Sequence, residues 1–398
     1  MARFSISRYS TYLIFFLISI YFLIFATRNE NPNQNRKRDG KYENNIQISK
    51  VFPQNGNEET LENVPWKIEN VKVEKLVDLE ISRNKTYLIS DFEYSNGLGN
   101  LLFQVASLIS IASSYNSILL LPNTTSLRRA FSLNSPNIQF ISPNTYQILD
   151  SQIMRSSSSK TLKSCCKYEE FTLSKNNKFE KINGFFQNFR YFHKNREELL
   201  SIFDFIEPVQ QKVEEFMESV GISLSIKKAK LFETNVANDD QAFEADPENT
   251  ISTTMIVGVH IRHGIDITMN SRNRKHGHIE APIEYYIRSM EQIANVYEDV
   301  AFIICSDDMS WVRRRLKLKD SKIPLYYCPG PREVDMAILA QCDSIIISTG
   351  TFGWWAAYLN KNNSPDIYYY KHWPAEGSMM SKMLNKTEYF LENWVSLE

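Results

Sequence analysis

The sequence predicts an α/β protein made of two doubly wound, Rossmann-like domains that face each other across a cleft. Beyond residue 86, short apolar runs alternate with helix-length segments, a pattern typical of parallel sheets covered by helices on both faces. Two such blocks occur, at about 86–245 and 250–398, and an acidic, polar stretch over 235–250 lies between them. The chain of 398 residues is also longer than the ~250–300 residues at which a single core stops growing.

The expected elements follow one another in a regular order. In the first block, strands at 86–90 and 117–121 flank a helix at about 101–115. The strands expected in the second block lie at 254–262, 300–305, 324–327, 343–348 and 366–370. The helices between them lie at about 282–297, 309–318, 332–341 and 351–360. Because ligands of such sheets bind beyond the carboxyl ends of the strands, site residues are expected there.

The chain before residue 86 is predicted to lie outside both domains. Residues 11–26 are uncharged and apolar, slightly short of the ~17–25 residues that span a bilayer, and Arg3 and Arg8 precede them. This predicts a signal anchor after a cytoplasmic tail (1–10), with the rest of the chain in a lumen. A cleaved signal peptide ending at Ala26 is the alternative. The polar segment 27–85 is predicted to be a flexible stem.

Glycosylation signals and cysteines agree with a lumenal location. Asn-x-Ser/Thr acceptors occur at Asn84, Asn123, Asn362 and Asn385, although Pro365 follows the third of them. The five cysteines have no metal-binding spacing, and an odd number leaves at least one outside any internal disulfide. Cys305 ends an apolar run, so it is predicted to be a buried free thiol.

The charge balance excludes a general attraction to polyanions. Lys and Arg together number 45 and Asp and Glu 46, which gives a net charge of −1. Nucleic acid is therefore not an expected partner, and any anionic ligand must be held by a local site.

The stretch GVHIRHGID (258–266) offers such a site. Side chains alternate along a strand, so Gly258, His260 and Arg262 share one face, and Arg262 lies at the carboxyl end. A guanidinium there requires an anionic partner. The partner is either a buried carboxylate in a structural ion pair or a phosphate held by two parallel hydrogen bonds.

A second feature that favours anions follows the expected strand at 343–348. Ser348, Thr349, Gly350 and Thr351 lead directly into a helix, whose first N–H groups and positive dipole end attract phosphate. Ordinary helix caps use the same residue types. Together with Arg262, this turn predicts a diphosphate cradle, and the lysine of a P-loop is absent.

Five stretches of this sequence carry a family resemblance. In chain order they are GLGNLLFQVASL, GFFQNFRYF, VGVHIRHGID, CSDDMSWV and STGTFGWWAAYL. They resemble stretches of the α-1,2-fucosyltransferases, in particular an invertebrate type of galactoside 2-α-L-fucosyltransferase. VGVHIRHGID is similar to the family's His-x-Arg-Arg-Gly-Asp signature, and STGTFGWWAAYL is similar to its Thr-Phe-Gly-x-Trp-Ala-Ala segment. The resemblance covers about 97–360.

The resemblance implies a GT-B fold and a type II, single-pass Golgi membrane protein, held in the lipid bilayer by residues 11–26 with its catalytic region in the lumen. It implies an enzyme that transfers L-fucose from GDP-β-L-fucose to a galactose hydroxyl of a glycan, with inversion and in α-1,2 linkage. GDP-fucose is then the donor substrate, a galactose-terminated glycan is the acceptor, and neither a bound cofactor nor a metal ion is expected.

The resemblance also implies roles for individual residues. Arg262 would bind the donor diphosphate with His260 beside it, and Asp307 would lie near the guanine or ribose. Phosphate would be bound at Ser348, Thr349, Gly350 and Thr351. A loop near the fucose would contain Gly97, Gly99 and Asn100. Asp266 is the candidate catalytic base, with Glu280, Glu284 and His263 as alternatives.

Departures from the family pattern leave other hypotheses open. His263 stands in place of the second arginine, Ile265 in place of the aspartate, and Leu101 in place of a glutamine. A catalytically degenerate, lectin-like protein that binds nucleotide-sugar or glycan is one alternative, and a membrane-tethered adhesion module is another. A histidine metal site and stacking of Trp354, Trp355 or Trp373 on sugars are also possible. The histidines of that metal site would be His260, His263, His276 and His278.

Overall fold

The computed structural model describes residues 73–81, 85–92, 97–155, 159–170, 172–174, 176–222, 254–362 and 365–398. The predicted tail, anchor, interdomain stretch (235–250) and Asn84 lie outside these residues, as does most of the predicted stem. No helix in the described ranges is long and apolar enough to cross a membrane. All the described residues belong to one compact unit, Glu59–Glu398.

Two six-stranded sheets form the fold, and every strand pairing in them is parallel. This confirms the predicted α/β class with two parallel sheets. All seven predicted strands and all five predicted helices are present, with ends within three residues of those expected. Their periodicity was readable because each is a run that is apolar on at least one face.

The first sheet has the strand order β1-β4-β3-β2-β6-β5. Its strands are β1 (Val73–Glu74), β2 (Thr86–Ile89), β3 (Ser117–Pro122), β4 (Ile138–Ile141), β5 (Ser159–Thr161) and β6 (Phe179–Asn183). Its helices are α2 (Leu76–Ile81), α3 (Leu98–Ser114), α4 (Pro143–Arg155), α5 (Arg196–Ile202) and α6 (Glu207–Ser219). β1 and α2 lie before the predicted boundary at residue 86, and β1 pairs with β4. Two residues of strand are too short to produce a visible alternation in the sequence.

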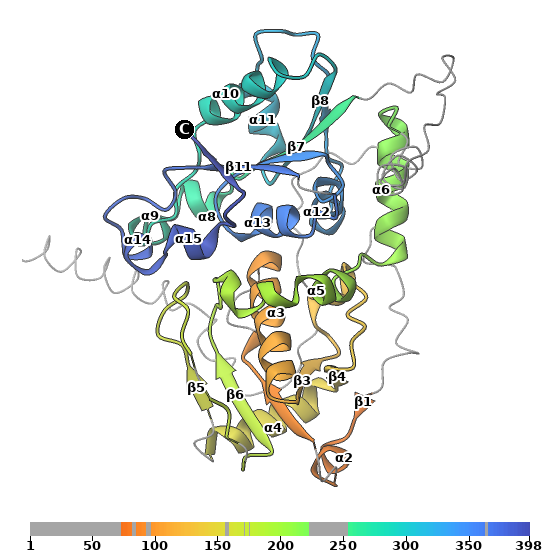
Figure 1. Ribbon diagram of the computed structural model, residues 1–398, viewed down its shortest axis with the longest axis vertical. Coiled ribbons are helices and arrows are strands. Elements are labelled where there is room, and N and C mark those ends of the chain that lie inside the picture. The colour runs from red at the N-terminus through yellow and green to blue at the C-terminus, as the bar shows by residue number, and fades with distance from the viewer. Residues whose placement is uncertain are drawn as a thin grey trace, which may run out of the picture. The chain divides into compact units, whose positions relative to one another are not determined.

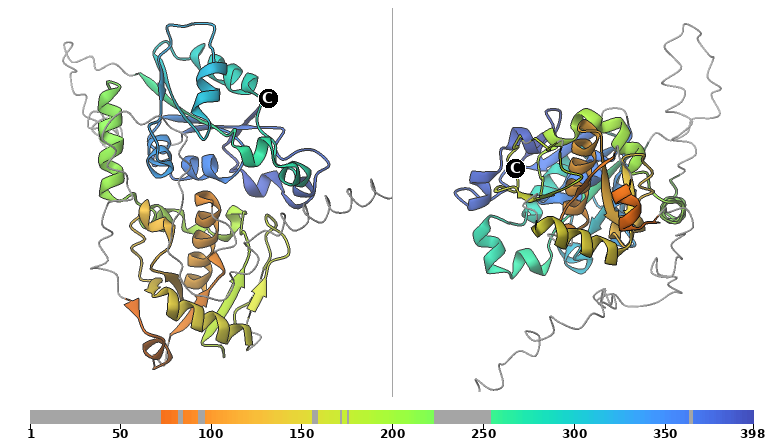
Figure 2. Two further views of the ribbon diagram at one scale, coloured as in Figure 1. Left: turned by 180° about the vertical axis from the view of Figure 1, so that it is seen from behind. Right: turned by 90° about the horizontal axis from the view of Figure 1, so that it is seen from below.

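Alternation along the strands explains how the first sheet is covered. Leu88 of β2 packs with α3, whereas its neighbours Tyr87 and Ile89 pack with Leu149 of α4. β3 behaves in the same way, with Leu120 on the α4 side. Because successive side chains of a strand point to opposite faces, α3 and α4 cover opposite faces of the sheet (Figures 1 and 2).

The second sheet has the strand order β12-β11-β10-β7-β8-β9. Its strands are β7 (Met255–Ile261), β8 (Val300–Ser306), β9 (Leu325–Tyr327), β10 (Ser344–Ile347), β11 (Asp366–Tyr370) and β12 (Val395–Leu397). Its longer helices are α10 (Ile283–Ala294), α11 (Met309–Arg315), α12 (Arg332–Leu339) and α13 (Thr351–Tyr358). The short ones are α8 (Ile265–Thr268), α9 (Ser271–His276), α14 (Met379–Met383) and α15 (Lys386–Tyr389).

The two faces of β7 are those the sequence predicts. Val257, Val259 and Ile261 pack in one cluster with Tyr286 of α10. On the opposite face, a Cβ added to Gly258 would lie 2.9 Å from Leu339 of α12. The face that carries His260 and Arg262 is therefore the face covered by α12 and α13 (Figure 1).

Buried aromatic side chains join the helices of the two sheets. The ring of Phe103 in α3 lies 4.6 Å from that of Trp354 and 5.2 Å from that of Trp355, both in α13. Trp354 and Trp355 are fully buried, and Trp373 is 3% exposed. These three indoles are therefore core residues rather than platforms for a sugar, and one continuous apolar cluster contains side chains from both sheets.

Candidate functional site

The strand order of the second sheet places its switch point between β7 and β10. Counted from β7, the order is 3-2-1-4-5-6, the arrangement of dinucleotide-binding folds, in which ligands bind where the order reverses. Arg262 directly follows β7, and Ser348 to Thr351 directly follow β10. The backbone N–H of Arg262 donates to Ser348 Oγ at 3.2 Å, so the two predicted features meet at this edge.

Ser348 is a buried hydrogen-bonding residue at the switch point. Its Oγ accepts a hydrogen bond of 2.6 Å from the Tyr286 hydroxyl as well as the bond from Arg262, and the residue is buried. Burial raises the pKa of Tyr286, so its hydroxyl keeps the donated proton. Ser348 thus ties the ends of β7 and β10 to α10, and its binding of phosphate stays a prediction. Tyr286 is not among the predicted site residues.

The guanidinium of Arg262 is held by two carboxylates. Its Nη2 donates to Asp266 Oδ2 at 2.5 Å, and its Nη1 donates to Asp307 Oδ2. The side chains of Arg262, Asp266 and Asp307 are 29%, 54% and 29% exposed, so this network lies at the rim of the sheet and not inside a core. An anionic ligand could reach Arg262 here in competition with the carboxylates.

Asp307 links the end of β8 to the residues that follow β7. Its two carboxylate oxygens accept hydrogen bonds from the Arg262 side chain and from the backbone N–H of His263. The reason is the register of β7 and β8: His260 pairs with Cys305, so the residues just beyond each strand lie side by side. Only the sheet order, which the sequence does not reveal, brings them together. The place of Asp307 near a guanine or ribose stays a prediction.

His263 lies in a polar pocket of its own. Its Nδ1 is 3.0 Å from Asp308 Oδ2, its Nε2 is 4.0 Å from Glu280 Oε2, and its ring stacks on Trp311 with centroids 3.9 Å apart. The imidazole thus occupies a stacked, carboxylate-paired position that a guanidinium also suits. Of the alternative bases, His263 and Glu280 lie together.

The N-terminal turn of α13 contacts the N-terminal turn of α3. Thr351 Oγ1 donates a hydrogen bond of 2.8 Å to Asn100 Oδ1. A Cβ added to Gly99 would lie 2.6 Å from the backbone carbon and oxygen of Thr351, so only glycine permits this approach. The loop predicted to lie near the fucose therefore reaches the predicted phosphate turn, and the Thr351 hydroxyl is already used by Asn100.

Two buried polar atoms at this turn have no hydrogen-bond partner among the described residues: Thr349 Oγ1 and His260 Nδ1. Gly350 lies between Thr349 and the first residue of α13, and its φ of 86° is a conformation that favours glycine. A buried hydroxyl without a partner just before a helix can donate a hydrogen bond to an anionic oxygen, and the first N–H groups of the helix supply further donors.

His260 is neutral at physiological pH. Burial lowers its pKa to about 3, with a further contribution from the nearby Arg262 charge. A Cβ on Gly353 would lie 2.5 Å from His260 Nδ1, so the imidazole is packed directly beneath α13. His260 therefore packs against the first turn of α13, and its predicted contact with the ligand stays a prediction.

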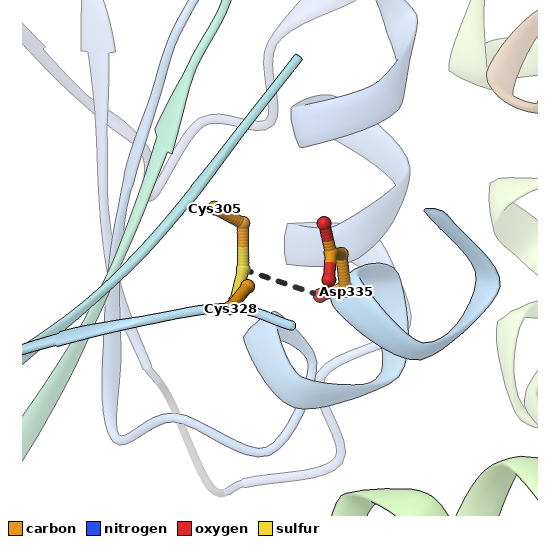
Figure 3. A group of neighbouring side chains, drawn as sticks. All are labelled: Cys305, Cys328 and Asp335. Carbon is orange, nitrogen blue, oxygen red and sulfur yellow. Dashed lines mark hydrogen bonds between the residues drawn. A yellow bond between two sulfur atoms is a disulfide. The ribbon is translucent and has the colours of Figure 1, made fainter. Parts of the chain in front are cut away.

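The four histidines of the alternative metal site do not form a metal-binding group within the described residues. The group there with metal-ligand geometry is Cys305, Cys328 and Asp335, and its two sulfur atoms are joined in a disulfide (Figure 3). Cys305 is thus not the free thiol predicted. β8 and β9 pair with Ile304 opposite Tyr327, which places the next residues, Cys305 and Cys328, side by side. The thiol outside the disulfides is Cys342.

Replacing Asp335 by asparagine is expected to stabilise the protein more at pH 8 than at pH 5. Burial raises the Asp335 pKa to about 7 from the ordinary aspartate value of 3.8. Between these values the folded protein retains a proton that the unfolded chain has lost, so stability falls as pH rises through this window. Asparagine keeps an acceptor for the Gly330 N–H. Thermal unfolding at both pH values measures the difference; an equal shift at both would contradict the assignment.

A cavity of about 1170 Å³ lies away from these residues. It is lined by side chains that include His193, Arg196, Tyr358 and Trp394, and by no predicted site residue. The chemistry of the rim around Arg262, and not cavity size, therefore defines the candidate site. Asn362 also lines this cavity and donates through Nδ2 to the Cys342 carbonyl at 2.8 Å, which occupies the nitrogen that a glycan would need.

A known protein family matches the part of the chain that carries this site. Residues 235–398 match the model of Glycosyl transferase family 11. This stretch is therefore similar to members of that family. Galactoside alpha-(1,2)-fucosyltransferase 1 of Leontopithecus chrysomelas is 26% identical over 223 residues, which are 55% of this chain and 53% of that protein. The O-antigen biosynthesis glycosyltransferase WbnK of Escherichia coli is 26% identical over 168 residues, 41% of this chain and 50% of that protein.

The chain spans about half the length of these curated relatives. Among solved structures, NodZ α-1,6-fucosyltransferase soaked with GDP-fucose is 14% identical, with a TM-score of 0.40 over 72% of this chain and 96% of that one. POFUT1 in complex with GDP is 10% identical, with a TM-score of 0.42 over 71% of this chain and 97% of that one.

Proposed function

We propose that this protein is a fucosyltransferase that transfers L-fucose from GDP-β-L-fucose to a galactose hydroxyl of a glycan, in α-1,2 linkage. The observation that carries the proposal is the meeting of Arg262 with the turn into α13 at the switch point of the second sheet, within the stretch that matches Glycosyl transferase family 11. A site of this kind suits a nucleoside diphosphate, because it combines a cation with helix N–H groups.

The site would act chiefly on the leaving group. A galactose oxygen attacks C1 of fucose from the face opposite the diphosphate, the bond from C1 to the phosphate oxygen breaks, and the β-configured donor gives an α-linked product. Negative charge then grows on GDP. Arg262 and the first turn of α13 would stabilise it, and fixed donors of this kind contribute strongly to catalysis.

Donor binding would exchange the partners of Arg262. In the ligand-free arrangement Asp266 and Asp307 hold the guanidinium at the rim. A diphosphate that takes one of these hydrogen bonds would release the half-exposed Asp266 carboxylate, which could then accept the proton of the galactose hydroxyl. Thr349 Oγ1 would gain the hydrogen-bond partner that it lacks among the described residues.

The two parallel sheets suit a GT-B transferase. Transfer is expected to need no metal ion, because Arg262 and the helix N–H groups can stabilise the charge of the departing diphosphate. The apolar segment 11–26 supports a type II anchor in the Golgi membrane, with the described residues in the lumen. Two disulfides suit that oxidising compartment.

Incubation of the full chain in detergent with labelled GDP-fucose and a panel of galactose-terminated acceptors tests the function. Transfer that persists in a chelator, with a product cleaved by an α-1,2-specific fucosidase, is the expected result. Binding of GDP-fucose without transfer to any acceptor would favour the lectin-like alternative. The absence of any thermal shift with GDP would contradict a nucleotide site altogether.

A further inference from the structure

A short segment, Phe186 to Asn188, connects the two helix N-termini described above to an unusual disulfide. Gln187 Nε2 donates to Asn100 Oδ1 at 2.8 Å, and this is the same oxygen that accepts from Thr351 Oγ1. With both hydrogen bonds on one oxygen, the Asn100 amide is fixed in rotation. Gln187 therefore acts on Thr351, the first residue of α13, through a single intervening side chain.

The segment is held in turn by Cys165 and Cys166, which form a disulfide between adjacent residues. Such a bond closes a small ring around the peptide group between the two cysteines, and this ring restricts the backbone. Both cysteine carbonyls are used as acceptors: Cys165 O from Gln187 N at 2.9 Å, and Cys166 O from Asn188 Nδ2 at 3.2 Å. The Cys165 carbonyl thus holds the backbone of Gln187, and the Cys166 carbonyl holds the side chain of the next residue, Asn188.

Asn188 extends the connection to the C-terminal part of the chain. It is fully buried, and its Nδ2 also donates to Glu388 Oε2 at 2.8 Å, while Arg190 Nη1 donates to the other oxygen of Glu388 at 3.0 Å. Glu388 lies in α15. The segment is therefore anchored on both sides, and a shift of Gln187 would break several hydrogen bonds, among them the buried one from Asn188 Nδ2 to the Cys166 carbonyl.

We infer that Gln187 is a positioning residue for the donor site, and that the Cys165–Cys166 disulfide keeps it in place. It locks Asn100 against Thr351 and so fixes the N-terminal turn of α13 before any donor arrives. This inference rests on the proposed function, since α13 is assigned there to the diphosphate. It follows that the adjacent cysteines contribute to donor affinity, although neither touches the donor.

Gln187→Leu tests the positioning role, because leucine keeps much of the side-chain volume and removes the N–H group that donates to Asn100. We expect the KM for GDP-fucose and the Kd for GDP to rise about tenfold with kcat changed less than threefold, since a site ordered before binding loses less entropy when it binds. Gln147→Leu, at an exposed position on α4, is the matched control and should change neither constant. A lower Tm with an unchanged Kd for GDP would mean a purely structural role and overturn the inference.

A second readout does not depend on GDP. Hydrogen–deuterium exchange of the backbone N–H groups at 350–353 in the ligand-free protein should be at least fivefold faster in Gln187→Leu than in the parent and in Gln147→Leu. If the parent fails to bind GDP but exchange rises as expected, the proposed function fails and the positioning role stands. If exchange is unchanged, the positioning role fails whatever the outcome with GDP.

The cysteine pair is tested by a double substitution, Cys165→Ala with Cys166→Ala. Faster exchange at 350–353 and a weaker Kd for GDP are expected, as for Gln187→Leu. Peptide mass analysis of the parent without reductant should find the 163–170 peptide two hydrogen masses lighter than its dithiol form. Free thiols there, or a double variant with parental exchange and affinity, would remove the disulfide from the inference.

Discussion

Arg262→Ala is expected to lower kcat/KM for fucose transfer by about 10²- to 10³-fold. Arg262 is the cation at the switch point of the second sheet, and the charge on the departing diphosphate develops as the sugar–phosphate bond breaks. Removal of one fixed donor to such a charge costs on the order of 10²–10³ in rate in other enzymes. Initial rates with varied GDP-fucose and a saturating acceptor measure the change.

Two further substitutions give this result its meaning. Arg262→Lys keeps the charge but loses the planar fork, so it should recover only part of the activity. Arg313→Ala removes an arginine of α11 whose guanidinium lies over the Tyr327 ring, and it should leave kcat/KM within a factor of two. Parental transfer by Arg262→Ala would assign Arg262 to a structural ion pair with Asp266 and Asp307 and would leave the diphosphate without its cation.

The alternation of side chains along a strand made the most secure part of the site predictable. Once residues 254–262 are a strand, His260 and Arg262 must share a face, because the backbone geometry allows no other arrangement. Gly264 after the strand placed Arg262 at the carboxyl end of β7, and the Ser/Thr/Gly turn after the next apolar run placed Thr351 at the start of a helix. Both predictions are confirmed, and both rest on local geometry alone.

Contacts across the sheet were not predictable in this way. Asp307 reaches Arg262, and Cys305 reaches Cys328, only because β8 lies between β7 and β9 in a given register. The order of strands in a sheet depends on how whole helices pack, which one sequence does not reveal. The burial of Trp354 likewise depends on Phe103, about 250 residues earlier in the chain.

The departure at His263 has a physical reading in the structure. A guanidinium at that position would be paired with Asp308 and stacked on Trp311, and the imidazole keeps both contacts.

Gly99→Ala is expected to lower the free energy of unfolding by about 1–3 kcal/mol and GDP affinity at least tenfold. Elsewhere in a helix this change would be favourable by up to about 1 kcal/mol, since alanine is the better helix former. Here the new Cβ would lie 2.6 Å from the backbone of Thr351 and 2.7 Å from its Oγ1, and backbone atoms cannot move aside as a side chain does.

A control variant in the same helix shows whether the effect comes from the contact between α3 and α13. The helices α3 and α13 must part to admit the methyl group, which would break the bond from Thr351 to Asn100 and displace the turn that carries Thr349. Ser110→Ala, in the same helix, removes a buried hydroxyl without a partner among the described residues and should cost nothing. Thermal unfolding and GDP titration of both variants measure the contrast. Parental stability and GDP affinity in Gly99→Ala would mean that α3 does not pack against α13 in solution. The donor site would then consist of Arg262 and α13 alone, without residues of α3.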